Sequence, residues 1–268
     1  MRSSQGVEVA VHDFGGDGPL LVMAHATGFH GMVYQPLAHK LNSHFHCVAF
    51  DFRGHGKSVL PPAASLDWHR MTDDLLAVID GLSAEKPVRV FGHSMGGACI
   101  ALAAQREPDR ILSAWTYEPI LLPALANPQP SQIAEGARRR RPVFPSRSDA
   151  RANYQAKPPL DLLSSDALDW YVEHGFVELP DGTVQLACLP ETEAMVFEGA
   201  HSGALEAALS TSVPFAVAVG SDGGMPAQAG RAAALRAPNL TLVPMDLSHF
   251  GPLEAPETVA SAVIRWFL

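Results

Sequence analysis

The sequence contains little cysteine, few charged residues and no long uninterrupted apolar run. Its three cysteines, Cys47, Cys99 and Cys188, are widely spaced without a Cys-x-x-Cys pair, which argues against a disulfide framework and a zinc site. No apolar run reaches the ~18 residues that a bilayer-spanning helix needs. The first residues also lack the apolar stretch of a secretory signal peptide. We therefore expect a cytoplasmic protein that has no membrane partner.

Basic residues are scarce relative to acidic ones. The 268 residues include 19 Lys and Arg against 28 Asp and Glu, which gives a net charge of −9 and makes a nucleic-acid partner unexpected. The one basic run, Arg138 to Arg141, is interpreted as a solvated or salt-bridged helix face, with contact to an acidic substrate as the alternative. His44 and His46 have no evident third ligand, so no metal site is expected there.

Apolar segments of strand length alternate with amphipathic segments of helix length, and this alternation predicts a mainly parallel sheet flanked by helices. Several expected strands are apolar on both faces, as in a sheet that is covered on both sides. The expected strands are 7–12, 20–25, 46–51, 88–92, 112–118, 215–220 and 240–244. The expected helices include 34–41, 68–81, 95–106, 226–236 and 256–267.

The rhythm is interrupted between residues 119 and 212. This stretch is rich in proline and has helical segments such as 165–173, but it lacks a repeated strand–helix unit. We predict that residues 1–118 and 213–268 form one core domain and that 119–212 form a helical cap, or lid. The apolar cap residues could line a substrate pocket or pack the cap against itself, and the sequence leaves both open: Leu121, Leu122, Leu125, Phe144, Trp170, Tyr171 and Phe176.

The strongest motif is Gly-His-Ser-Met-Gly at residues 92–96. It follows an expected strand and precedes an expected helix, which is the setting in which G-x-S-x-G forms a nucleophile elbow. Such a turn strains the backbone at Ser94 and requires small neighbours. Ser94 is therefore the candidate nucleophile. Serine needs a base, and His249, between the last expected strand and the final helix, is the candidate.

In four ordered blocks the sequence resembles the α/β-hydrolase superfamily. The blocks are Met-Ala-His-Ala-Thr-Gly at 23–28, Asp-Phe-Arg-Gly-His-Gly-Lys-Ser at 51–58, the elbow at Ser94 and the loop at His249. The second block is not a P-loop, because Asp51 stands where that motif needs glycine. The resemblance implies that this block is structural and that the fold is an α/β-hydrolase core with an inserted cap.

An oxyanion hole needs two amides aimed at the developing alkoxide. The residue after the nucleophile, Met95, is expected to supply one. The resemblance implies Thr27 for the other, although Ala26 stands where the family usually has glycine. Among α/β-hydrolases the acid follows the serine and precedes the histidine in the chain. Asp222, after the strand 215–220, is preferred as this acid, and Glu118, at the end of the previous strand, is the alternative.

The expected reaction is hydrolysis of an ester or lactone of a small, partly apolar substrate through an acyl-serine. No metal or organic cofactor is expected. Carbon–carbon bond hydrolysis of a diketone-like substrate and perhydrolysis use the same triad and remain alternatives, as does a non-catalytic member of the fold that binds a small ligand. A carboxylate-nucleophile hydrolase is excluded, because the elbow carries serine. The sequence indicates no oligomeric state.

Overall fold

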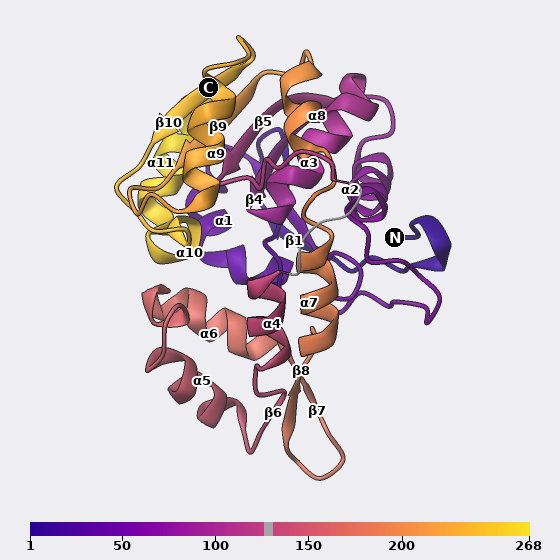
Figure 1. The fold of residues 1–268 in the computed structure, drawn as a ribbon, viewed down its shortest axis with the longest axis vertical. Coiled ribbons are helices and arrows are strands. Elements are labelled where there is room, and N and C mark those ends of the chain that lie inside the picture. The colour runs from indigo at the N-terminus through magenta and orange to yellow at the C-terminus, as the bar shows by residue number, and fades with distance from the viewer. Residues whose placement is uncertain (126–130) are drawn as a thin grey trace.

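The computed structural model describes residues 1–125 and 131–268. Its centre is a seven-stranded sheet with the order β1-β3-β2-β4-β5-β9-β10, in which β1 is antiparallel to β3 and the other neighbours are parallel (Figure 1). This is the mainly parallel sheet that the alternating pattern predicts. The strands are β1 (Val11–Gly15), β2 (Leu20–Ala24), β3 (His46–Phe50), β4 (Val88–His93), β5 (Ile111–Tyr117), β9 (Phe215–Val219) and β10 (Leu240–Pro244).

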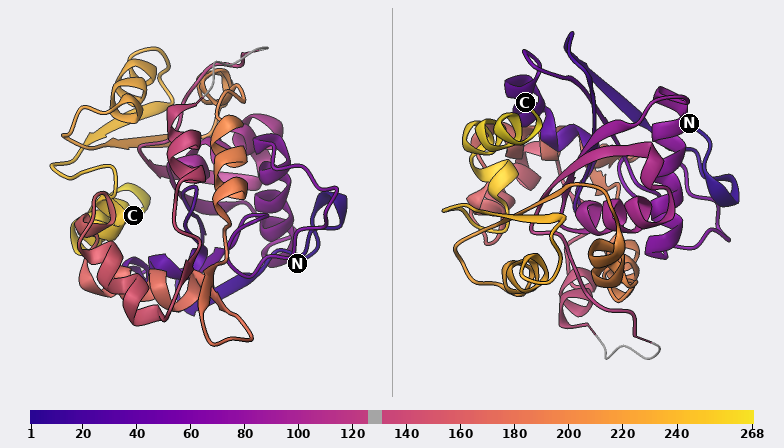
Figure 2. Two further views of the ribbon diagram at one scale, coloured as in Figure 1. Left: turned by 60° about the horizontal axis from the view of Figure 1, so that its bottom comes forward. Right: turned by 90° about the horizontal axis from the view of Figure 1, so that it is seen from above.

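Helices cover both faces of the sheet. Successive strand residues enter different cores: Val90 and Val217 pack on the face covered by α2, α3, α8 and α9, whereas Phe91 and Ala216 pack on the face covered by α1 and α11. Figure 2 shows α11 (yellow) and the purple and magenta α2 and α3 on different sides. The core helices are α1 (Gln35–Leu41), α2 (Trp68–Leu82), α3 (Met95–Arg106), α8 (Ala204–Ser210), α9 (Met225–Ala234), α10 (Gly251–Glu254) and α11 (Pro256–Phe267).

Six of the seven expected strands match observed strands to within one residue at each end, and the first is wrong in position. The sheet strand β1 is Val11–Gly15, whereas Glu8 forms only isolated bridges with Arg2 and Val59. Val7 and Val9 are buried against the core without joining the sheet. Their apolar alternation therefore reports burial rather than strand pairing. No helix in the described ranges is long and apolar enough to cross a membrane.

Residues 131–198 form a separate layer, which we call the cap (lower half of Figure 1). The expectation of a purely helical insertion needs two corrections. The cap also contains an antiparallel three-stranded sheet, β6-β8-β7, and α8 packs on α3 in the core. The expected range 119–212 includes 126–130, which lie outside the described residues. The cap elements are α4 (Gln132–Arg138), β6 (Val143–Phe144), α5 (Arg147–Gln155), α6 (Ser165–His174), β7 (Phe176–Glu178), β8 (Val184–Leu186) and α7 (Pro190–Glu198).

Short 3₁₀ turns complete the chain, at Ser4–Gly6, Gly31–Tyr34, Pro108–Arg110 and Leu160–Leu162. The block 51–58 forms the turn after β3. The Asp51 carboxylate accepts hydrogen bonds from the amides of Gly31 and Lys57 at 2.7 and 2.8 Å, so it fixes two adjacent loops. Arg53 is fully buried and paired with the buried Asp74 at 2.7 Å. These contacts fit the structural role that the resemblance implies.

Replacing Asp74 with asparagine should lower the free energy of unfolding by about 3–5 kcal/mol, because it leaves the Arg53 charge buried without a counter-charge. Urea denaturation followed by circular dichroism measures this loss. Asp80→Asn is the matched control: Asp80 also pairs with an arginine, Arg110, but its side chain is 58% exposed, so about 1 kcal/mol or less is expected. Equal losses in the two variants would contradict the buried-charge explanation.

Candidate functional site

Ser94 lies in a sharp turn between β4 and α3. Its backbone has φ 54° and ψ −114°, a region that L-residues rarely adopt. The turn is closely packed: a Cβ on Gly96 would lie 2.3 Å from the carbonyl oxygen of Ala24, and one on Gly92 would lie 2.7 Å from the amide nitrogen of Gly97. The small residues of the motif are therefore required sterically, and the strain points to function rather than to an ordinary turn.

His249 lies in the loop of residues 245–250, between β10 and α10, which we call the histidine loop. Its ring Nδ1 is 2.6 Å from Oε2 of Glu118. Glu118 follows the last residue of β5, is fully buried and has φ 41°, which is a second strained position. A carboxylate only accepts hydrogen bonds, so Nδ1 carries the proton and Nε2 keeps its lone pair. Ser94 and His249 line the same cavity.

Asp222 lies beside the histidine loop but does not bond to the ring. Its carboxylate accepts hydrogen bonds from the backbone amides of His249, at 3.2 Å, and Gly224, at 3.1 Å. The contact with the imidazole is made by the acid that the sequence analysis held as the alternative: Glu118, not Asp222, bonds to the ring. The reason is position, because Glu118 directly extends β5, the neighbour of β4, whereas Asp222 lies in an exposed turn beyond the end of β9.

The loop after β2 offers an amide at Thr27. The amide of Ala26 donates to Tyr34 Oη at 3.3 Å, and that of Gly28 donates to His55 Nε2 at 3.2 Å. Among the hydrogen bonds of the described residues, neither the Thr27 amide nor the Met95 amide, at the start of α3, serves as donor. Both belong to residues that adjoin the cavity or its nucleophile, so these two N–H groups remain available to a ligand.

Two buried histidines, His25 and His55, form hydrogen bonds that fix the loop after β2. His25 Nε2 accepts from the amide of Phe52 at 2.9 Å, which leaves Nδ1–H to donate to the carbonyl of Ala26 at 2.8 Å. Burial lowers the pKa of His25 well below its usual range and also lowers the pKa of His55. Both rings are therefore uncharged at neutral pH, and each holds one defined tautomer that fixes the course of residues 25–28.

Two connected hollows meet at Ser94. The first has a volume of about 360 Å³ and the second a volume of about 790 Å³, and both are mainly apolar. Both reach Thr27, Ser94 and His249 from the core and Ile133 and Phe197 from the cap. The carboxyl ends of the strands form the floor and the cap forms the ceiling. This arrangement encloses a small substrate in a largely apolar space.

The ceiling of the smaller hollow contains an ion pair. Arg140 bonds to Glu193, and it also donates to the hydroxyl of Tyr171 at 2.6 Å and that of Tyr154 at 3.3 Å. Glu193 rests on the loop after β2, because a Cβ on Gly28 would lie 2.4 Å from its Oε1. The sequence pattern indicates neither Arg140 individually nor Glu193 as a cavity residue. The basic run was the only signal for the arginine.

The rest of the basic run behaves differently. Arg138 forms ion pairs with Glu135, Glu191 and Glu198 on the cap surface, in agreement with the interpretation as a salt-bridged helix face. Arg141 lies over the ring of Phe144, 4.5 Å from its centroid. Consecutive residues in this run therefore face opposite sides of the cap, and only Arg140 reaches the hollow beside Ser94.

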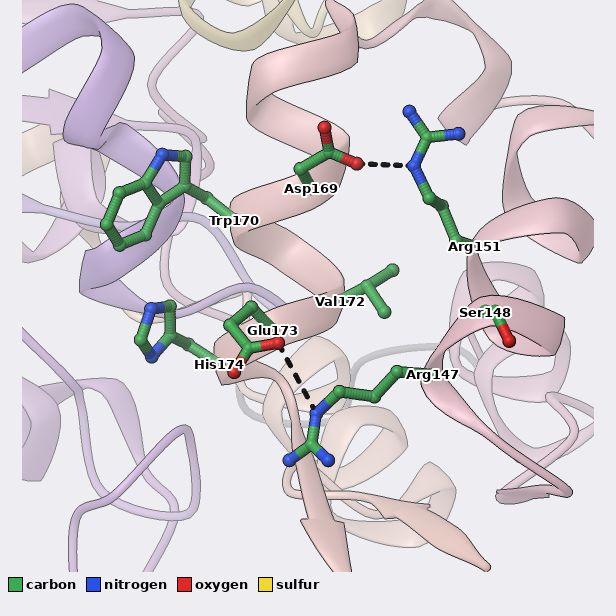
Figure 3. Close-up of a pocket in the computed structure, with 8 residues that line it drawn as sticks. All are labelled: Arg147, Ser148, Arg151, Asp169, Trp170, Val172, Glu173 and His174. Carbon is green, nitrogen blue, oxygen red and sulfur yellow. Dashed lines mark hydrogen bonds and ion pairs between the residues drawn. The ribbon is translucent and has the colours of Figure 1, made fainter.

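The apolar cap residues divide between the two expected roles. Tyr171 and Leu122 line the hollows at Ser94. Phe144 and Phe176 instead pack on each other in the cap core. Trp170 lines a separate hollow between α5 and α6, stacked on His174 with 5.0 Å between ring centroids (Figure 3).

This outer hollow has a volume of about 400 Å³ and includes neither Ser94 nor His249. Its two arginines are already paired, Arg147 with Glu173 and Arg151 with Asp169 (Figure 3). No reactive pair of nucleophile and base lines it in the described part of the chain. Ser94 and His249 line the two other hollows instead.

The chain is similar in sequence to known proteins. 2-(Acetamidomethylene)succinate hydrolase of Mesorhizobium japonicum is 33% identical over 98 residues, 37% of this chain and 34% of that protein. Lipase LipV of Mycobacterium tuberculosis is 29% identical over 177 residues, 66% of this chain and 65% of that protein. The chain thus spans less than two thirds of the length of each of these relatives.

Solved structures share the fold. The crystal structure of E-2-(acetamidomethylene)succinate hydrolase superposes with a TM-score of 0.79 and 22% identity, covering 98% of this chain and 96% of that one. The sequence model of the alpha/beta hydrolase fold matches residues 19–187, which include the second block, the elbow and most of the cap. On this match, the chain belongs to the alpha/beta hydrolase fold family.

Proposed function

We propose that the protein is a serine hydrolase that cleaves a carboxylic ester or lactone of a small, partly apolar substrate through an acyl-serine intermediate. One observation carries the proposal. Ser94, whose backbone is strained, lines one cavity together with His249, and the Glu118 carboxylate is hydrogen-bonded to the His249 imidazole. The name of the lipase relative supports ester chemistry. No other candidate reaction is favoured by a specific contact.

In the first half-reaction, Ser94 Oγ attacks the substrate carbonyl carbon and His249 Nε2 takes the hydroxyl proton. Glu118 holds the Nδ1–H tautomer and stabilises the imidazolium that forms. The tetrahedral oxyanion accepts hydrogen bonds from the Thr27 and Met95 amides. When it collapses, the carbon–oxygen bond to the alcohol breaks and His249 gives its proton to the leaving alkoxide oxygen, so that an acyl-serine remains.

In the second half-reaction, water attacks the acyl carbonyl as His249 takes its proton. Collapse of the second tetrahedral intermediate returns that proton to Ser94 Oγ and releases the carboxylic acid. Within the described part of the chain, Ser94 Oγ and His249 Nε2 are not hydrogen-bonded to each other. Catalytic hydrogen bonds are often long in unliganded enzymes and tighten in the substrate complex.

Substrate size and polarity follow from the two hollows. Both hollows are mainly apolar and suit an apolar acyl or alcohol group, and the smaller one also contains the polar group of Arg140, Glu193 and Tyr171. Because Glu193 already neutralises the Arg140 charge, the ceiling has no net charge to attract an anion. We therefore expect an uncharged substrate rather than an acidic one.

A substrate panel tests the reaction class. The purified protein should be supplied with p-nitrophenyl esters of graded chain length, a small lactone, a ring-cleavage diketone, and an ester together with hydrogen peroxide. Turnover of esters or the lactone, together with labelling of Ser94 by a phosphonate probe located by peptide mass spectrometry, would support the proposal. Cleavage of the diketone alone would favour carbon–carbon hydrolysis, and peracid formation would favour perhydrolysis. Absence of Ser94 labelling in folded protein would count heavily against Ser94 as the nucleophile and against an acyl-serine intermediate.

Gly28→Ala should lower kcat for ester hydrolysis by about 10–100-fold with a smaller change in KM. Gly28 has φ 77°, and a Cβ there would collide with Oε1 of Glu193, so either the Glu193 carboxylate or the loop that bears the Thr27 amide must shift. Removing one oxyanion donor typically costs 10²–10³ in kcat, and displacing it should cost somewhat less. Steady-state kinetics on the best p-nitrophenyl ester measures the effect.

Gly182→Ala is the matched control. Gly182 has φ 83°, but a Cβ there meets no atom within 4 Å, and it lies in the cap hairpin far along the chain from the site. The two substitutions therefore impose similar backbone strain. If both lower kcat equally, backbone strain explains the loss; if neither does, the added Cβ does not displace the Thr27 amide and the expected loss is wrong.

A further inference from the structure

His93, the residue before the nucleophile, bonds to the main chain of the histidine loop. Its Nε2 is 2.8 Å from the carbonyl oxygen of His249. A carbonyl only accepts hydrogen bonds, so Nε2 carries the ring proton and donates it. His93 is fully buried at the end of β4, and its ring centroid lies 5.2 Å from that of His249.

The other side of the same ring leads to the loop after β2. With the proton on Nε2, Nδ1 has a lone pair and accepts from the Tyr34 hydroxyl at 2.7 Å. The Tyr34 oxygen in turn accepts from the amide of Ala26 at 3.3 Å. Every donor faces an acceptor, in the order Ala26 amide, Tyr34 hydroxyl, His93 ring, His249 carbonyl. We call this series the buried relay.

The surroundings keep the buried relay uncharged. Tyr34 is 1% exposed, and burial raises the pKa of its hydroxyl, so it remains a donor at all ordinary pH values. Burial lowers the pKa of His93 to about 3. The aromatic neighbours are Phe91 beside Tyr34 and Tyr117 beside His93. A neutral ring with one tautomer is a rigid link, because neither end can exchange donor for acceptor.

We propose that His93 and Tyr34 are positioning residues that fix the histidine loop relative to the loop bearing the Thr27 amide. The inference rests on the proposed function, in which those two loops supply the base and an oxyanion donor. The buried relay connects the two loops across the nucleophile, and its members His93 and Ala26 adjoin the smaller hollow. Since a misplacement of about 1 Å can cost 10²-fold in rate, a link of this kind would act on kcat rather than on substrate binding.

Other contacts hold the histidine loop from the opposite side. The Tyr117 hydroxyl donates to the carbonyl of Ser248 at 2.8 Å, and Glu254 accepts from the amide of Ser248 at 2.9 Å. Those contacts tie the loop to β5 and α10, not to residues 25–28. If these contacts alone fix the position of the histidine loop, removing the hydrogen bond from His93 should have little effect on kcat. That result would contradict the proposal.

The first test is independent of activity. In ¹⁵N-histidine-labelled protein, long-range ¹H–¹⁵N spectra should show His93 as the neutral Nε2–H tautomer, unchanged from pH 5 to pH 8. His93→Asn should shift the amide resonances of both Ala26 and Phe250, at the two ends of the buried relay. The Nδ1–H tautomer, titration within this range, or a shift at one end only would overturn the relay even if ester hydrolysis is confirmed.

The second test separates the two ring nitrogens by kinetics. His93→Gln places an amide N–H near the Nε2 position and should keep kcat within about 5-fold. His93→Asn keeps an acceptor toward Tyr34 but not the donor toward His249, and should lower kcat about 10–100-fold with KM within about 3-fold. Tyr34→Phe added to His93→Asn should cost less than the product of the single effects, because the two residues act as one unit.

The outcomes distinguish this inference from the proposed function. Equal kcat in wild type and His93→Asn, a raised KM with unchanged kcat, or full additivity would overturn the positioning role while leaving the hydrolase intact. If the wild type neither hydrolyses esters nor labels at Ser94, the proposed function fails, and the catalytic purpose of the buried relay fails with it. Melting temperatures identify any variant that loses activity by unfolding.

Discussion

Ser94→Ala is expected to lower kcat for ester hydrolysis by on the order of 10⁴–10⁶-fold, to a residual rate that the amides and substrate binding alone provide. The substitution removes the attacking oxygen, so no acyl-enzyme can form. Its position permits the change without a fold defect, because Ser94 makes no side-chain cap to α3 and alanine is as small as the site requires. Steady-state kinetics with an active-site titration measures the loss.

Two controls make this result specific. Ser148→Ala, in the outer hollow between α5 and α6, should leave kcat within a factor of two, since that hollow contains no part of the candidate machinery. The substrate should still bind Ser94→Ala with a similar dissociation constant, because most of its contacts come from the apolar walls. Retention of full biological function by Ser94→Ala would instead favour a non-catalytic, ligand-binding member of the fold.

The residues proposed as nucleophile and base are each marked by a local signal in the sequence. Ser94 is surrounded by residues whose small size the turn demands, and His249 follows a strand at the edge where parallel strands present their carboxyl ends. Both signals come from residues that lie close in the chain to the residue they mark. The alternation of strands and helices is equally local, which is why most core elements match their expected ranges.

The residue order does not indicate which candidate acid contacts His249, because both candidates follow strands that end at the same edge. What separates them is the direction of the side chain. Glu118 has a positive φ that turns its carboxylate under the histidine ring, and its other oxygen, Oε1, accepts from the amide of Gly220 at 2.8 Å. Neither the dihedral angle nor the contact with Gly220 has a signature in the residue order.

The cap was harder to predict for a related reason. Its ceiling residues come from segments far apart in the chain, Arg140 after α4 and Glu193 in α7, and they meet only through packing. The sequence left open whether the apolar cap residues line a pocket or pack within the cap, and Phe144 and Phe176 pack inside the cap. Apolar residues identify a buried surface but not which side of it faces a ligand.

Glu118→Gln is expected to lower kcat by about 10³–10⁴-fold, whereas Asp222→Asn should cost less than about 5-fold. An amide in place of the Glu118 carboxylate can donate to Nδ1, which favours the wrong tautomer of His249, and it cannot stabilise the imidazolium. Asp222 only accepts from backbone amides, and an asparagine oxygen can still do so. The two substitutions are chemically matched, since each replaces one carboxylate oxygen with an amide nitrogen.

The pair of variants decides the acid because the two sites differ in what they contact. A large loss in Glu118→Gln with a small one in Asp222→Asn assigns the acid to Glu118, while the reverse restores the order that the sequence favoured. Comparable large losses would mean that the backbone bond from His249 to Asp222 is as important for ring position as the 2.6 Å bond to Glu118. Phosphonate labelling rates, which report attack by Ser94 alone, should fall in parallel with kcat only for the variant that lacks the true partner of the imidazole.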